Sequence, residues 1–166
     1  MNFADIQSGG SVFVDSNIFI YNFAPDPQFG LPCQELLERI EFGDLTAFCS
    51  THELSDVAHR LMTLEACQTF AWPYAGIGQR LRTHPAEIAQ LTRFRQALDE
   101  IVAFGVHVIP VTQSDIFQAA DLSRQHGLLS GDALIVAIMR ANNITNLACS
   151  DTDFDRVRGL IRFGPL

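Results

Sequence analysis

Short apolar segments alternate with longer helix-like segments along the chain, and this alternation restricts the fold more than any other feature. The segments expected to form strands are 11–14, 46–49, 106–109, 146–149 and 160–163. Apolar residues at helical spacing are found over 31–42, after Ser50, and over 85–104, 114–126 and 130–141. Strands that alternate with helices of about ten residues or more are typical of an α/β fold with a mainly parallel sheet.

Several helix ends carry local capping signals. Ser50 and Glu53 have the spacing of a capping box at the start of the helix that follows the second strand. Ser114 and Ser130 are expected to cap two later helices, and Gly127 is expected to end the first of these. These local signals predict where the helices begin and end.

Two stretches are less clearly patterned. By propensity alone, Ile18–Tyr21 could continue the first strand. Residues 66–84 break both periodicities and are expected to form a loop or a mobile insertion. The chain has 166 residues, of which 48% are apolar, and we expect a single domain spanning 1–166.

The charged residues exclude several kinds of chemistry. All 11 basic residues are arginine, so lysine Schiff-base chemistry and a P-loop lysine are excluded. The net charge of −8 argues against nonspecific attraction to nucleic acid as the main theme. Four widely separated cysteines are expected to be buried free thiols. Because no signal peptide or membrane span is visible, we expect a cytoplasmic protein.

Aspartates follow two of the expected strands. Asp15 ends the first strand and Asp151 follows the fourth. Asp132 lies in the first turn of the most apolar helix, and Asp56 lies in the second turn of the helix after the second strand. Ligands bind at the carboxyl ends of strands in open parallel sheets. Carboxylates gathered there would resist joint ionisation, and a divalent cation such as Mg²⁺ would offset that cost. Taken singly, each aspartate could instead serve a turn or a helix dipole.

These motifs resemble those of the PIN domain, the fold of many metal-dependent ribonucleases, including VapC toxins. Val14–Tyr21 resembles the opening strand and first acidic residue of that family, Gly131–Ala137 resembles its third acidic motif, and Ser150–Phe154 resembles its last. The resemblance covers nearly the whole chain in the right order. It implies a three-layer α/β/α sandwich with a central sheet of about four or five strands.

The second acidic position of the resemblance has two candidates. The family usually has a Glu about six residues after the strand-ending Ser, and counting from Ser50 leads to Asp56. Glu53 is the rival, but its capping box already explains it, so Asp56 is preferred. A further departure is Cys149, which stands where many members have Thr.

The resemblance implies a divalent metal, Mg²⁺ or Mn²⁺, surrounded by aspartates. The metal ligands would be Asp15, Asp132 and Asp151. Asp56 and Asp153 would complete the catalytic set. The reaction would be hydrolysis of RNA phosphodiester bonds.

Partners and rival functions also follow from this comparison. The resemblance implies an RNA substrate, an antitoxin protein and a homodimer. Ser16 and Asn17 would orient ligands by hydrogen bonding, although turn chemistry explains them equally well. A group of arginines could contact the RNA backbone, with an ordinary solvated surface as the alternative: Arg80, Arg82, Arg93 and Arg95.

Two other functions stay open at this point. One is a non-enzymatic PIN-like binding module. The other, favoured less, is a phosphatase of the haloacid dehalogenase type on a similar sheet. That phosphatase family uses a second aspartate at the position of Asn17 and a lysine, and this chain has neither.

Overall fold

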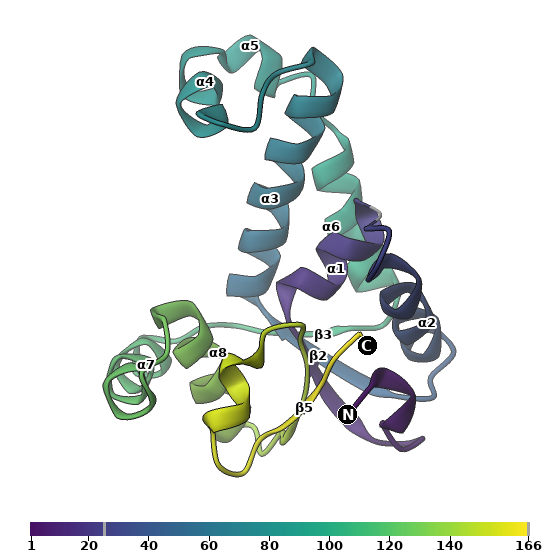
Figure 1. Cartoon of the computed structure of the whole chain (residues 1–166), viewed down its shortest axis with the longest axis vertical. Coiled ribbons are helices and arrows are strands. Elements are labelled where there is room, and N and C mark those ends of the chain that lie inside the picture. Colours follow the sequence, from purple (N-terminus) through teal and green to yellow (C-terminus); the bar gives the residue numbers. More distant parts are fainter. Residues whose placement is uncertain (25, 166) are drawn as a thin grey trace.

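A five-stranded parallel sheet forms the centre of the molecule (Figure 1). The structure, a computed structural model, describes residues 1–24 and 26–165. Its strands are β1 (Ser11–Val14), β2 (Thr46–Ser50), β3 (His107–Ile109), β4 (Asn146–Ala148) and β5 (Ile161–Phe163). They pair in the order β3-β2-β1-β4-β5, and every pair is parallel. The α/β fold class predicted from the sequence is confirmed.

Helices cover both faces of the sheet and give the expected three layers. They are α1 (Ser16–Phe23), α2 (Gly30–Glu41), α3 (Thr51–Phe70), α4 (Ile77–Thr83), α5 (Pro85–Ile88), α6 (Arg93–Ala103), α7 (Gln113–His126) and α8 (Ser130–Ala141). Two short 3₁₀ helices, η1 (Phe3–Asp5) and η2 (Thr152–Arg156), complete the described elements. The hydrophobic core is accordingly split by the sheet into two parts.

Strand β1 shows how the sheet separates these two parts. Its residues alternate, so Val12 and Val14 pack into the cluster with α1, α2 and α3, while Phe13 packs into the cluster with α7 and α8. All three side chains are fully buried. A strand that is buried on both faces has an unbroken run of apolar residues, and this run predicts the strand from the sequence.

The strand order creates a switch point between β1 and β4. The chain moves outward from β1 through β2 to β3, and then returns to add β4 and β5 on the other side of β1. The backbone N–H of Asp15 donates to the carbonyl of Ala148 at 3.0 Å, so the ends of β1 and β4 are directly joined. In doubly wound sheets this is where a ligand site is expected.

The prediction for Ile18–Tyr21 is corrected by the structure. These residues belong to α1, whose first turn begins directly after Asp15. The backbone N–H of Ile18 donates to the carbonyl of Asp15 at 3.1 Å, and the side chains of Ile18 and Phe19 are fully buried. Packing of this helix into the core therefore overrides the strand propensity of its branched residues.

The expected loop over 66–84 is largely helical. Helix α3 continues to Phe70, and α4 follows, so only the short connection between them is irregular. The helix expected over 85–104 is instead two helices, α5 and α6, separated by four residues. A small hydrophobic cluster explains both differences, because Ile77, Leu81 and Leu91 pack together against the end of α3.

Capping was predicted correctly at one helix and wrongly at two. Ser50 and Glu53 do form the capping box of α3. Ser114 lies inside α7, whose capping box is formed by Thr112 and Asp115. Ser130 is the first residue of α8 and caps nothing, because the cap position is Leu129, which offers no side-chain acceptor.

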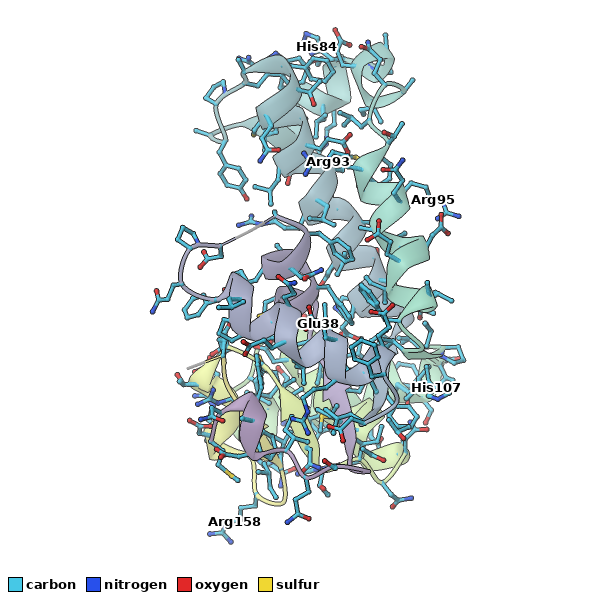
Figure 2. The ribbon with its side chains drawn as sticks, turned by 90° about the vertical axis from the view of Figure 1, so that its right-hand side faces the viewer. Glu38, His84, Arg93, Arg95, His107 and Arg158 are labelled. Atoms are coloured by element: carbon cyan, nitrogen blue, oxygen red, sulfur yellow. The ribbon has the colours of Figure 1, made fainter. Side chains whose placement is uncertain are left out.

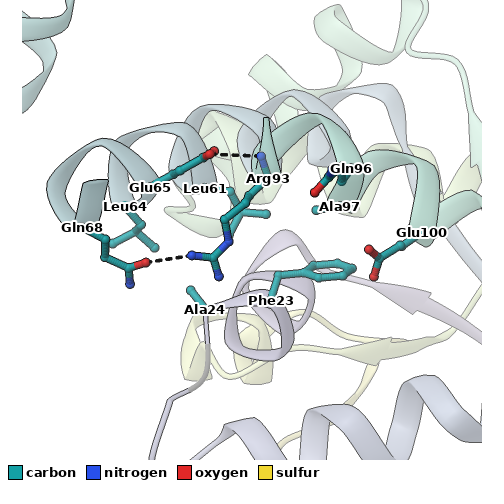
Figure 3. A pocket seen from close by; sticks show the side chains of 10 residues that line it. All are labelled: Phe23, Ala24, Leu61, Leu64, Glu65, Gln68, Arg93, Gln96, Ala97 and Glu100. Carbon is teal, nitrogen blue, oxygen red and sulfur yellow. Dashed lines mark hydrogen bonds between the residues drawn. The ribbon is translucent and has the colours of Figure 1, made fainter. Parts of the chain in front are cut away.

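The molecule has a projection that we call the distal arm, defined as residues 60–95. Figure 1 shows α4 and α5 at the end of α3 that lies away from the sheet. The first turn of α6 is fixed to α3 by Glu65, whose carboxylate accepts from the backbone N–H groups of Thr92, Arg93 and Phe94 at 2.9, 3.1 and 3.2 Å. Figure 3 shows the hydrogen bond from Arg93. Helix α6 has no side-chain cap of its own, so Glu65 supplies it from a neighbouring helix.

Two further sequence predictions can be compared with the structure. The cysteines are free thiols, and all are buried except Cys67, which is half-buried. Over residues 1–24 and 26–165, the helices are each too short or too polar to span a membrane.

Candidate metal centre

Four aspartates gather where β1 and β4 end. Asp15 is the cap residue of α1, and Asp151 is the cap residue of η2. Asp153 lies in the first turn of η2, and Asp132 lies in the first turn of α8. Because β1 and β4 are neighbours in the sheet, their carboxyl ends bring together residues that are far apart in the sequence.

Three of these carboxylates are close enough to share one ion. Asp132, Asp151 and Asp153 each offer an oxygen atom, and these atoms lie within 4.8 Å of one another. Asp132 is half-buried, and the other two are exposed. A set of carboxylate oxygens alone is the donor set that Mg²⁺ and Mn²⁺ prefer, so the residues fit a hard divalent cation.

Asp15 lies deeper than the other three and is held by several donors. Its side chain is 8% exposed. The Ser16 hydroxyl donates to Oδ1 at 3.1 Å, and the Asn17 amide donates to Oδ2 at 2.6 Å. Burial raises the pKa of Asp15 above its ordinary value, while hydrogen bonds from the side chains of Cys149 and Ser16 and from the backbone of Asn17 and Ser16 oppose that rise. Ser16 and Asn17 therefore both contact Asp15, an arrangement that fits either a role in orienting ligands or simple turn chemistry after β1.

Charge repulsion ties Asp15 to the other three carboxylates. The pKa of Asp132 is raised, first by burial and then by the charges of Asp151, Asp15 and Asp153. Arg156 opposes this rise and forms an ion pair with Asp153 at 2.9 Å. The structure therefore brings Asp15, Asp132, Asp151 and Asp153 into one electrostatic group. Neutralising this group with a cation would relieve the repulsion.

Cys149 bridges β4 to Asp15. Its thiol donates to Asp15 Oδ2 at 2.6 Å, and its sulfur accepts from the backbone N–H of Asp151 at 3.2 Å. Burial and the neighbouring Asp15 charge raise the thiol pKa far above its ordinary value. The thiol therefore stays protonated at neutral pH and acts as a donor, which is also the role that a threonine hydroxyl could play there.

Glu53 and Asp56 are separated by burial. Glu53 is 1% exposed, and its carboxylate accepts from the backbone N–H of Ser50 at 2.9 Å. Its pKa is raised, first by burial and with a smaller contribution from the charge of Asp15. The side chain of Asp56 is 55% exposed and faces His52 at 3.5 Å. The preferred interpretation of the sequence expected Asp56 in the group around Asp132. The structure does not bring it there.

The pair formed by Asp56 and His52 nevertheless borders the site. A Cβ atom added to Gly131 would lie 3.4 Å from Nε2 of His52, so the histidine lies against the start of α8. Gly131 immediately precedes Asp132. His52 was not singled out as a site residue from the sequence, and its spacing of four residues from Asp56 was the only available signal.

Arg156 is a second neighbour that the sequence interpretation missed. Its position three residues after Asp153 on a helical turn was the signal that could have identified the ion pair. The predicted arginine group lies elsewhere, on α4 and α6, and Arg95 there pairs with Asp99 at 2.5 Å.

Comparisons with known proteins were made for the sequence and for the structure. Residues 12–160 match the family model of the PIN domain. The sequence is 28% identical over 152 residues to VapC ribonuclease Mb1869c of Mycobacterium bovis and to ribonuclease VapC13 of Mycobacterium tuberculosis. In both cases the match covers 91% of this chain and 98% of the relative.

Two solved structures have the same fold. VapBC2 from Rickettsia felis, bound to a DNA fragment from its promoter, matches with a TM-score of 0.58 and 18% identity. That match covers 93% of this chain and 98% of the other. A toxin–antitoxin complex from Klebsiella pneumoniae matches with a TM-score of 0.55 and 14% identity, over 90% of this chain and 95% of the other.

Proposed function

We propose that this chain, which belongs to the PIN domain family, is a divalent-metal-dependent ribonuclease that hydrolyses RNA phosphodiester bonds. The observation that carries the proposal is the convergence of Asp15, Asp132, Asp151 and Asp153 at the switch point of a parallel sheet. Its relatives named as ribonucleases cover nearly the same length of chain, which supports the same assignment. Mg²⁺ or Mn²⁺ is the proposed metal, because the clustered donors are all carboxylate oxygens.

The residues around the metal have separable tasks. A bound divalent cation supplies a Lewis acid for a phosphate oxygen and lowers the pKa of water at the site. Asp132, Asp151 and Asp153 would hold the cation, with Asp15 as the deepest ligand. Asn17 and Cys149 donate to the same oxygen of Asp15 and so fix the orientation of its carboxylate.

The role of Asp56 is proposed separately, because its carboxylate lies outside the cluster. We propose that Asp56 acts at the rim of the site together with His52. Glu53 is the rival acidic residue, since its buried carboxylate is influenced by the charge of Asp15. The two variants Asp56→Asn and Glu53→Gln distinguish these roles. Asp56→Asn should lose cleavage by orders of magnitude, whereas Glu53→Gln should keep its capping acceptor and most of its activity.

The test of the function is cleavage of RNA with and without Mg²⁺. Asp15→Asn and Asp132→Asn should each abolish Mg²⁺-dependent cleavage and leave the fold intact, since each removes a charge and little volume. Asp121→Asn is the matched control, because Asp121 is an exposed residue of α7. This variant should cleave RNA at the wild-type rate. Wild-type activity in Asp15→Asn or Asp132→Asn would remove that residue from the centre.

The rival functions make different predictions in the same experiments. A binding module without useful metal affinity would show no rise in melting temperature when Mg²⁺ is added. A phosphatase on this sheet would release phosphate from small monoesters and leave RNA chains uncut. The observation that favours the nuclease over the phosphatase is that Asn17 donates a hydrogen bond to Asp15, which leaves it no role as a second acid.

The proposed partners are RNA, an antitoxin protein and a second copy of the chain. Similarity to VapBC2 from Rickettsia felis and to a toxin–antitoxin complex from Klebsiella pneumoniae supports an antitoxin partner and a toxin function. The proposed location of this function is the cytoplasm. Exposed apolar side chains on and after α7, namely Ile116, Phe117 and Leu129, are compatible with a homodimer. Co-expression with the product of a neighbouring small reading frame, followed by measurement of the mass in solution, tests both protein partners.

A further inference from the structure

The distal arm differs in charge from the rest of the protein. From residue 60 to residue 95 the chain has five arginines and two glutamates, which gives +3. Because the whole chain carries −8, the remaining residues carry −11. One of the two glutamates, Glu65, is buried and occupied as a helix cap, so it does little to screen the arm's surface. The positive potential of the molecule is therefore concentrated on this projection.

Three arginines of the arm are available to an anionic partner. Among the described residues, no carboxylate forms an ion pair with Arg60, Arg80 or Arg82, and all three are exposed. Arg93 and Arg95 differ, since Arg93 donates to Gln68 and Arg95 pairs with Asp99. Figure 2 shows Arg93 and Arg95 on the lower part of the arm, and His84 at the end of the molecule opposite Arg158.

Aromatic rings hold two of the free arginines in place. The guanidinium of Arg60 lies 5.0 Å from the centre of the Tyr74 ring and donates to the Tyr74 hydroxyl, and that of Arg80 lies over the ring of Trp72 at 5.4 Å. Neither contact neutralises a guanidinium, so the positive charge and the remaining N–H donors stay available. The Trp72 ring is itself fixed by Phe70 at 4.9 Å, whereas Tyr74 is 52% exposed.

Helix α3 connects this surface to the carboxylate centre. His52, Asp56 and Arg60 are spaced four residues apart, so they lie along one side of the helix. His52 borders Asp132 through Gly131, and Arg60 contacts Tyr74 of the arm. The twenty residues of α3 span about 30 Å. A continuous side of one helix thus leads from the acidic site to the basic, aromatic surface.

We propose that the distal arm is a second RNA-binding surface, which takes single-stranded segments of the substrate beyond the scissile bond. This inference rests on the proposed ribonuclease function. Tyr74 offers a ring on which a base stacks, and Arg60, Arg80 and Arg82 contact the phosphate backbone. Rings interleaved with cations are the combination that single-stranded nucleic acid binds without sequence preference. The arm also compensates for the acidic centre, which by itself repels a polyanion.

The test compares two substrates: a tetranucleotide, and a single-stranded RNA long enough to reach from the carboxylate centre along α3 to the distal arm. In the full-length Asp132→Asn protein, binding of the long RNA is followed by fluorescence anisotropy. Adding Tyr74→Ala should weaken that binding about 5- to 100-fold, whereas Tyr74→Phe should restore it. Arg80→Ala should reduce the slope of log K against log salt by about 0.7. Phe42→Ala and Arg140→Ala remove an exposed ring and an exposed arginine elsewhere and should change neither quantity.

Cleavage by the enzyme with its aspartates intact separates the arm from the centre. With Tyr74→Ala and Arg80→Ala combined, cleavage of the long RNA should slow, while the tetranucleotide should be cut at the wild-type rate. Unchanged long-RNA binding in this variant would overturn the proposal, as would an equal loss on both substrates, which would indicate a defect at the centre. If the wild-type chain cuts neither RNA but the arm variants still weaken binding, the proposed function fails and the arm assignment stands.

Discussion

Glu65 provides the sharpest test of how the distal arm is attached. Its carboxylate accepts hydrogen bonds from three backbone N–H groups at the start of α6, and Glu65 is 7% exposed. Two of them, from Thr92 and Arg93, reach Oε1, and the third, from Phe94, reaches Oε2. Glu65→Gln keeps one oxygen acceptor and replaces the other with an amide donor. The variant therefore loses the bond from Phe94 and the negative charge at the helix terminus.

The expected cost follows from these two losses. A hydrogen bond to a charged group contributes about 1.5–3 kcal/mol, and a charge at a partly buried helix terminus contributes up to about 2 kcal/mol. Both free-energy ranges describe the same interaction, so its loss is counted once, at about 2 kcal/mol. For a domain of this size, each kcal/mol corresponds to about 2–4 °C. The melting temperature of Glu65→Gln should therefore fall by about 4–8 °C.

Thermal unfolding followed by circular dichroism measures this change. Glu100→Gln is the matched control, since Glu100 is exposed on α6 and lines the same pocket as Glu65 (Figure 3). A surface change of that kind should stay within about 0.5 kcal/mol. Cleavage of a tetranucleotide, measured below both melting temperatures, should be unaffected. If the two variants melt together, Glu65 does not hold α6 in the way that the hydrogen bonds suggest.

Two more predictions concern the centre and the thiols. In the absence of metal, Asp132→Asn should melt higher than wild type at neutral pH, because the raised pKa of Asp132 means that its ionisation opposes folding. The difference should vanish below about pH 4, the ordinary pKa range of the group, and melting curves in EDTA across pH test this. For the thiols, iodoacetamide at pH 8 followed by mass spectrometry should label Cys67 first. Burial raises the pKa of Cys33 and of Cys49 to about 12, so labelling of either before Cys67 would contradict the packing.

Local patterns in the sequence predicted the sheet well. Each of the five strands lies where an apolar segment predicted it, and the capping box of Ser50 and Glu53 was correct. These features depend on residues that are neighbours in the sequence. Asp15 and Asp151 could be placed together as well, because neighbouring parallel strands end at one edge of a sheet. Asp15 directly follows β1, and Asp151 comes three residues after the last residue of β4.

Features that depend on distant contacts could not be predicted in this way. Helix α6 starts at Arg93 because Glu65, on another helix, caps it, while Thr92 at the cap position makes no side-chain cap hydrogen bond. Helix α4 exists because Ile77 and Leu81 find partners at the end of α3. Single residues of a short amphipathic segment say little until the surface against which they pack is known.

The choice between Glu53 and Asp56 shows the same limit at the site. The two residues are three positions apart on α3, so they share a side of the helix and no periodicity separates them. Burial separates them, and burial depends on the sheet and α8. Glu53 faces inward, where the Asp15 charge reaches it, whereas Asp56 faces outward toward His52. The sequence named both candidates and favoured Asp56, but it could not show which of the two side chains faces inward.

The carboxylate group at the switch point has a consequence for the balance between stability and function. Folding brings four aspartates together, and at least one of them, Asp132, is made harder to ionise, first by its burial and then by the charges of the other three. The chain limits this cost with Arg156 and with the donors around Asp15, but neither removes it. A cation that binds the folded state lowers its free energy, so a divalent ion at this group would offset the repulsion. Metal binding and folding stability should therefore be coupled in this protein, and the same repulsion that destabilises the metal-free form provides the driving force for loading the centre.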